Sequence, residues 1–303
     1  MKTSSTVLPS LAMLAAVFLW SSATPGSKFV LGEIPVAEFV VVRLSLAAAA
    51  LWLIVLATGT RAGLRTTGWR PLVMGLLEPG LVTLLVSAGL TMTSPVSGSV
   101  FWGLMPLLMP VLGRVVLGEP IEGIVVAAAA VAFTGTLVLV WGQTHHGGGS
   151  VLGDVLVAGG VLAAAFNSLL SRRNAQAGAN PLATSSWQLT SACCVAFALL
   201  LVLPADELRS PGASGAAVAV LVYLGLVVSV GVYILSNYAV RHLPVARMGL
   251  LGCLTAPLGA ALSAALLGTR VSVLDVAAVC LIIGAVALPT VLQLRRRQAE
   301  PSG

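Results

Sequence analysis

Ten apolar segments, each long enough to cross a lipid bilayer, divide this chain of 303 residues. One transmembrane helix needs about 20 mostly apolar residues, and glycine, proline and charged residues separate such runs. We predict spans at residues 8–26, 35–57, 71–91, 95–117, 120–141, 151–171, 181–203, 214–238, 244–267 and 271–292. Their composition favours helices and lacks the short alternation of a membrane barrel. The predicted fold class is therefore an all-α integral membrane protein.

The composition supports lipid as the surrounding solvent. Hydrophobic residues make up 58% of the chain and charged residues only 9%, whereas a soluble domain has about a quarter of its residues charged. The first apolar run could be read as a cleaved signal peptide. Cleavage would leave an odd set of spans and break the repeat described below, so we interpret this run as a retained first helix.

The basic residues predict the orientation of the chain in the membrane. Positive loops stay on the cytoplasmic side. Lys2, Arg61, Arg65, Arg70, Arg114, Arg172, Arg173, Arg241, Arg247, Arg295, Arg296 and Arg297 share one predicted side, whereas Lys28, Arg209 and Arg270 lie on the other. Both termini are therefore expected in the cytoplasm, with the protein in the cytoplasmic (inner) membrane. Anionic lipid headgroups account for the net charge of +6, so no nucleic-acid partner is expected.

The chain is internally doubled. RVVLGEP matches AALLGTR, EIPVAEF matches ANPLATS, and TSPVSGS matches HLPVARM. We predict a first five-helix repeat, an extracellular linker, a second repeat and a basic cytoplasmic tail, at residues 1–142, 143–150, 151–294 and 295–303. Because each repeat holds an odd number of spans, the two lie inverted in the membrane. Inverted repeats are typical of secondary transporters, whose sites lie near the membrane midplane.

Four stretches carry a resemblance to a known family. They are FLWSSATPGSKFVL, VVVRLSLAAAALWL, TSPVSGSVFWGLMPLLMPVLGRVVLGEP and the segment YLGLVVSVGVYILSNYAVRHLPVARMGLLGCLTAPLGAALSAALLG. In the order of these stretches and in their repetition in the two halves, the chain resembles the ten-helix EamA-type branch of the drug/metabolite transporter superfamily. One departure is that Thr269 and Arg270 stand where the second repeat usually has a Glu-Arg-like pair, so the role of Glu119 is not duplicated.

The resemblance implies a secondary transporter that exports amino acids or related small metabolites by alternating access. Proton coupling is left open. The alternatives are a multidrug exporter of amphipathic cations, or a non-transport membrane protein such as a lipid flippase subunit. The expected partners are a small-molecule substrate and membrane lipids, for a monomer or a homodimer. The chain has no phosphate loop and no nucleophile–base pair, so we expect no enzyme activity, no cofactor and no metal.

Glu78 is an acid that lies well inside a predicted span and not at a helix end, so helix capping does not explain it. It lies inside the third span, in the stretch GLLEPGLVT. A charge at the centre of a transmembrane helix costs about 2.5–3.5 kcal/mol on insertion scales, so it should face the bundle interior or a wet cavity. Pro79 removes an N–H and Gly80 allows close approach of another backbone, which together predict a bend. Glu78 is either a proton or cation site or the counter-ion of Arg43, the other charge inside a span.

Further polar and aromatic side chains could face the same cavity. We expect the substrate-binding or coupling site to draw on Glu78, Arg43, Trp20, Trp102, Asn167, Gln188, Tyr233 and Asn237. Amides also join transmembrane helices, and tryptophan also anchors span ends, so these structural roles stay open. Glu119 and Glu122 are interpreted as acids at the N-terminal end of the fifth span, beside Pro120. Ser272 and Asp275 resemble a capping box for the tenth span.

The orientation can be tested by labelling single cysteines in intact cells. Arg65→Cys should react only with a reagent that reaches the cytoplasm, and Gly148→Cys with a reagent that stays outside, because the charge asymmetry places these loops on opposite sides. Labelling of both variants from the same side would rule out the ten-span topology.

Overall fold

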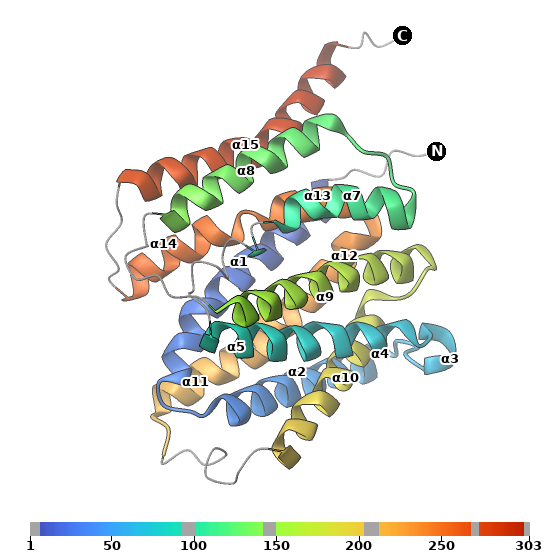
Figure 1. Cartoon of the computed structure of the whole chain (residues 1–303). Helices are drawn as coiled ribbons and strands as arrows, with labels where there is room; N and C mark the ends of the chain where they lie inside the picture. Colours follow the sequence, from blue (N-terminus) through green and yellow to red (C-terminus); the bar gives the residue numbers. More distant parts are fainter. Residues whose placement is uncertain are drawn as a thin grey trace.

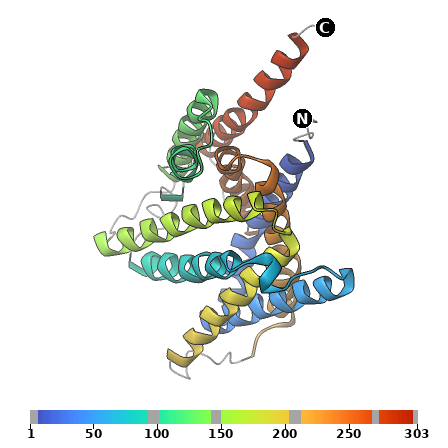
Figure 2. The same cartoon turned by 90° about the vertical axis from the view of Figure 1, so that its right-hand side faces the viewer.

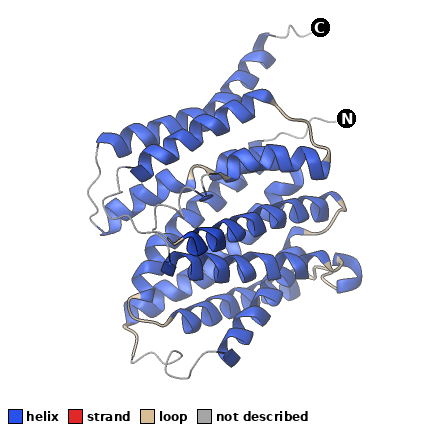
Figure 3. Ribbon diagram, viewed as in Figure 1, coloured by secondary structure: helices blue, strands red, loops and turns tan. Residues whose placement is uncertain are grey.

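The structure is a computed structural model that describes residues 7–92, 101–102, 104–141, 150–202, 212–267 and 273–299. Within these residues the chain folds into helices joined by turns, with no strand (Figure 3). The predicted all-α fold is therefore confirmed. The linker residues 143–149, the Thr269–Arg270 pair and Ser272 of the predicted capping box lie outside the described part.

The helices follow one another along both halves of the chain (Figure 1). In the first half they are α1 (Val7–Leu31), α2 (Val36–Thr58), α3 (Leu64–Thr67), α4 (Arg70–Gly75), the π-helical turn η1 (Leu76–Leu81), α5 (Val82–Met92), α7 (Met105–Leu117) and α8 (Gly123–Trp141). In the second half they are α9 (Val151–Gln176), α10 (Pro181–Val202), α11 (Gly215–Tyr223), the π-helical turn η3 (Leu224–Ser229), α12 (Val230–His242), α13 (Val245–Gly252), α14 (Thr255–Leu267) and α15 (Val273–Ala299).

Three of the predicted spans are built from more than one helix. The third consists of α4, η1 and α5, the eighth of α11, η3 and α12, and the ninth of α13 and α14. Among the described residues, four continuous helical stretches are long and apolar enough to cross a membrane: Val7–Leu31, Ala37–Thr58, Val151–Gln176 and Gly215–His242. Shorter apolar helices include Met105–Leu117, Gly123–Val138, Val245–Gly259 and Val276–Pro289. The count of ten spans stays a prediction.

Helix ends are set by local chemistry. Gly59 and Gly118 follow α2 and α7 with positive φ values of 62° and 70°, a left-handed conformation in which glycine carries no steric penalty. The N–H of Glu119 then donates to the carbonyl of Gly113 at 3.1 Å, which closes α7 and turns the chain sharply. At the start of α10, the Asn180 side chain accepts hydrogen bonds from the first-turn amides of Leu182 and Ala183, as helix caps do.

The helices of the two halves are interleaved. The most extensive contacts join α5 with α9, α8 with α15, α2 with α10, α4 with α10, and α1 with both α12 and α14, and each pair joins one half to the other. Figure 1 shows α8 lying along α15, and α5 beside α9 remains visible in the turned view of Figure 2. Buried apolar clusters fill these contacts, and one of them combines Leu51 of α2 with Leu189 of α10.

Many large apolar side chains lie on the outer surface of the bundle. Leu56, Val115 and Val151 are 74%, 76% and 79% exposed. Such a surface is unusual for a monomer in water and is typical of contact with lipid or with another apolar partner. The exposed residues thus agree with helices that are surrounded by a membrane.

The contact between α4 and α10 gives a stability prediction. A Cβ atom on Gly75 would collide with the backbone oxygen of Gln188. Gly75→Ala should therefore force the two helices apart and cost about 1–3 kcal/mol or more, visible as a lower midpoint of thermal unfolding in detergent. Gly284→Ala in α15 is the control, because nothing lies within 4 Å of its Cβ position. Equal midpoints for the two variants would contradict this packing.

Candidate functional site: a carboxylate at a broken helix

Glu78 lies where the helix of the third predicted span is interrupted. Its backbone is non-helical, with φ −141° and ψ 121°, inside the π-helical turn η1. Pro79 follows and has no N–H to continue the helical hydrogen bonds. Gly80 is buried, and a Cβ there would lie 2.9 Å from the Gly75 carbonyl and 3.1 Å from a Val195 methyl. The predicted bend is present, and it leaves the Glu78 side chain half-buried within the bundle.

Two amide side chains from the second half meet Glu78. Asn167 of α9 donates from Nδ2 to Glu78 Oε2 at 2.9 Å. Gln188 of α10 donates from Nε2 to the backbone carbonyl of Glu78 at 3.0 Å. A carbonyl left without its helical partner is costly when buried. Gln188 therefore supplies a hydrogen-bond donor to the backbone carbonyl of Glu78, and Asn167 supplies one to the Glu78 carboxylate.

The polar contacts continue from Gln188 into α12. Asn237 donates from Nδ2 to Gln188 Oε1 at 3.1 Å and to Ser185 Oγ at 3.0 Å. Ser171 donates to Asn237 Oδ1 at 2.8 Å. Asn167, Gln188 and Asn237 are only 7%, 2% and 5% exposed. We call Glu78, Asn167, Ser171, Ser185, Gln188 and Asn237 the central polar network.

Arg43 does not form an ion pair with Glu78. Its Nε donates to Ser229 Oγ at 3.0 Å, and its guanidinium carbon lies 5.7 Å from the centre of the Phe39 ring. In the described part of the chain the ion pairs within 4.0 Å are Arg172–Glu119 and Arg247–Glu122. The counter-ion alternative therefore fails as a direct contact. Tyr233 is half-buried against the apolar cluster around Leu51, and its backbone carbonyl accepts from Ser185 Oγ of the central polar network at 2.9 Å.

The two predicted tryptophans have other surroundings. Trp20 packs against an apolar cluster that includes Met13, Val17 and Leu243. Trp102 is 37% exposed. Within the described part of the chain, neither side chain is hydrogen-bonded to the central polar network.

Sequence reasoning missed three serines, two in the central polar network and one that binds Arg43. Ser171 lies four residues after Asn167, Ser185 lies three before Gln188, and Ser229 lies four before Tyr233. Residues three or four apart share a helix face. This spacing was the signal that could have found them.

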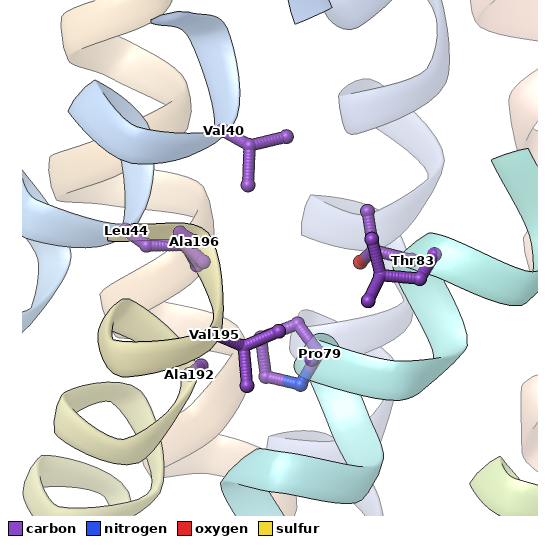
Figure 4. Close-up of a pocket in the computed structure, with 9 residues that line it drawn as sticks. Val40, Leu44, Pro79, Thr83, Ala192, Val195 and Ala196 are labelled. Carbon is purple, nitrogen blue, oxygen red and sulfur yellow. The ribbon is translucent and has the colours of Figure 1, made fainter. Parts of the chain in front are cut away.

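An apolar pocket begins one residue beyond Glu78. It is a small hollow that is partly open to the outside of the bundle. Figure 4 shows Pro79 and Thr83 on one side of it, and Val40 and Val195 on the others. It is lined by Val40, Leu44, Pro79, Gly80, Thr83, Leu84, Ala192, Val195 and Ala196. Among these residues Thr83 has the only polar side chain, so the pocket suits an apolar group.

A second polar cluster ties the turn between α7 and α8 to the second half. Glu119 Oε1 accepts from Arg172 Nε at 2.7 Å, and its Oε2 accepts from the backbone N–H of Val245 at 3.1 Å. Glu122 pairs with Arg247 at 3.0 Å. We call these four side chains the end cluster, because they lie at the end of the bundle that the basic residues predict to be cytoplasmic.

The end cluster corrects the predicted role of Glu119. Helix α8 begins at Gly123, so Pro120 is outside the helix and Glu119 does not cap it. The left-handed turn at Gly118 instead directs the chain so that the Glu119 carboxylate reaches the first amide of α13. An acid at a helix N-terminus is favourable, and here the helix belongs to the other half of the chain.

Comparison with known proteins adds an independent observation. The profile of the EamA-like transporter family matches residues 8–141 and 151–291, once in each half. An uncharacterized transporter of Bacillus subtilis (strain 168), YyaM, is 27% identical over 183 residues, which cover 58% of this chain and 60% of that relative. The match thus spans less than two thirds of the relative's length. A protein of known crystal structure shares the fold, with a TM-score of 0.78 over 94% of this chain and 98% of its own, at 22% identity.

The end cluster predicts unequal coupling within its two ion pairs. Arg172 and Glu119 are 14% and 11% exposed, whereas Arg247 and Glu122 are 25% and 38% exposed. A thermal-unfolding double-mutant cycle of Glu119→Gln and Arg172→Gln should show a coupling of about 1 kcal/mol or more, because each single variant leaves a buried charge. The matched cycle of Glu122→Gln and Arg247→Gln should show about 0.5 kcal/mol or less. The reverse order would contradict the described burial.

Proposed function

Because the chain belongs to the EamA-like transporter family, we propose that it exports amino acids or related small metabolites across the cytoplasmic membrane by alternating access, with Glu78 in the transport site. The family and the apolar helices make it a multi-pass membrane protein and a transporter rather than an enzyme. The substrate, the direction and the coupling are the proposal.

One observation carries the assignment of the site. Glu78 is an acid inside the bundle, at a broken helix, with one amide hydrogen bond to its carboxylate and no ion pair among the described residues. An acid in a membrane bundle that lacks a counter-ion is costly unless it titrates or binds a cation. Broken helices near the membrane midplane are also the usual place for substrate and ion sites in transporters built from inverted repeats.

The central polar network links Glu78 to more than one helix, which supports its place in the transport site. The contacts of Glu78 reach α9 and α10 directly and α12 through Gln188. A change in the charge of Glu78, by a proton or a substrate, therefore acts on three helices of the second half. Arg43 of α2, hydrogen-bonded to Ser229, offers a guanidinium to which a substrate carboxylate would bind.

The apolar pocket favours the second candidate, export of amphipathic cations. It starts at Pro79, next to the acid in the sequence, and its lining is almost entirely apolar. A cation with an apolar body would fit this pairing of a carboxylate with apolar surface.

The proposal is tested with Glu78→Gln in membrane vesicles that carry a proton gradient. Glutamine keeps the size of the side chain and can still accept from Asn167, but it cannot titrate. We expect proton-driven uphill efflux to vanish while downhill exchange of the same substrate remains. Measurement of substrate flux with and without the proton gradient distinguishes uphill efflux from downhill exchange.

The matched control is Glu33→Gln, which neutralises an acid in the turn between α1 and α2. Glu33 accepts from the Ser214 amide and hydroxyl at 2.7 and 2.9 Å, away from the central polar network. Its variant should keep proton-driven efflux. Normal proton-driven efflux by well-folded Glu78→Gln protein would remove Glu78 from the coupling step.

A further inference from the structure

The central polar network contains one buried oxygen without a hydrogen bond. Asn167 is 7% exposed, and its Oδ1 has no partner although it is fully covered. A buried unpaired amide oxygen costs about 1–3 kcal/mol, so such an atom needs a reason. The Nδ2 group of the same Asn167 amide is hydrogen-bonded to the Glu78 carboxylate.

The orientation of the Asn167 amide follows from that neighbour. A carboxylate only accepts hydrogen bonds, so the Nδ2 group must face Glu78. Oδ1 then faces away from the only hydrogen bond that the side chain makes within the described part of the structure. Rotating the amide would place two oxygens against each other.

The nearby amide donors point to other acceptors. Gln188 Nε2 donates to the Glu78 carbonyl, and Asn237 Nδ2 donates to Ser185 and to Gln188. An unpaired acceptor, Asn167 Oδ1, therefore lies beside the Glu78 carboxylate. What completes the network is a positively charged group that carries several N–H donors.

We propose that Glu78 and Asn167 form a subsite for a primary ammonium group of the substrate, with the carboxylate balancing its charge and Asn167 Oδ1 accepting one of its N–H bonds. This deepens the proposed function and rests on it. A quaternary ammonium has the same charge but no N–H, so it leaves Oδ1 unpaired.

The test is a comparison of hexylammonium with hexyltrimethylammonium on purified full-length protein in detergent. Binding is measured as the rise in unfolding temperature over a range of concentrations, which gives a dissociation constant. We expect hexylammonium to bind about tenfold or more tightly than hexyltrimethylammonium, because a hydrogen bond to a charged group is lost. Equal affinities would overturn the subsite, since charge and apolar contact alone would then account for binding.

Variants at Asn167 locate the preference. Asn167→Leu should bring the affinities of the two probes within about twofold of each other. Ser168→Ala is the matched control, because its hydroxyl donates to its own helix at Ala164 and its variant should keep the tenfold preference. If Asn167→Leu does not fold, Asn167→Ser takes its place. A preference that survives removal of the Asn167 amide would also overturn the proposal.

Failure of this subsite can be told apart from failure of the proposed function. Gradient-driven efflux of metabolites without an amine, together with equal probe affinities, would remove the ammonium subsite and leave the transporter assignment in place. A tenfold preference for hexylammonium in a protein that moves no substrate in vesicles would support the subsite and count against export.

Discussion

The interior of this bundle depends on how one carboxylate is accommodated among apolar helices. An acid far from water must be protonated, paired or hydrogen-bonded. The chain provides one amide contact to the Glu78 carboxylate and one to its backbone, and both come from the second half of the sequence. The break at Pro79 and the burial of Asn167 and Gln188 are thus parts of one arrangement. Removing either amide would take away a hydrogen bond of Glu78 inside the bundle.

The molecule separates its polar groups into two regions with different chemistry. The central polar network consists of neutral amides and hydroxyls around one acid, whereas the end cluster pairs two acids with two arginines. Paired charges hold elements in place, because breaking one pair exposes a costly charge. Amides and hydroxyls exchange partners more easily, since each can both donate and accept. A rigid end and an adaptable centre suit a protein that must bind and release a ligand.

Much of the central site could be predicted from the sequence because polar residues in apolar spans are rare. Glu78, Asn167, Gln188 and Asn237 were expected in one cavity, and the structure brings them together. The partner of Arg43 could not be predicted, since it depends on how α2 is rotated against η3. Glu119 was misread because a single left-handed glycine, Gly118, redirects the chain toward another helix. Sequence periodicity predicts the face of a helix but not which neighbour covers it.

The interleaved packing bears on the kind of motion that this fold permits. At Gly75 the backbones of α4 and α10 approach so closely that a methyl group does not fit. The pairs α5 with α9, α2 with α10 and α8 with α15 also join the two halves along their lengths. Separating residues 7–141 from 150–299 as two blocks would break all of these contacts at once. Rigid units that keep these contacts would each take helices from both halves, and the boundary between two such units would run between helix pairs and not along the sequence repeat.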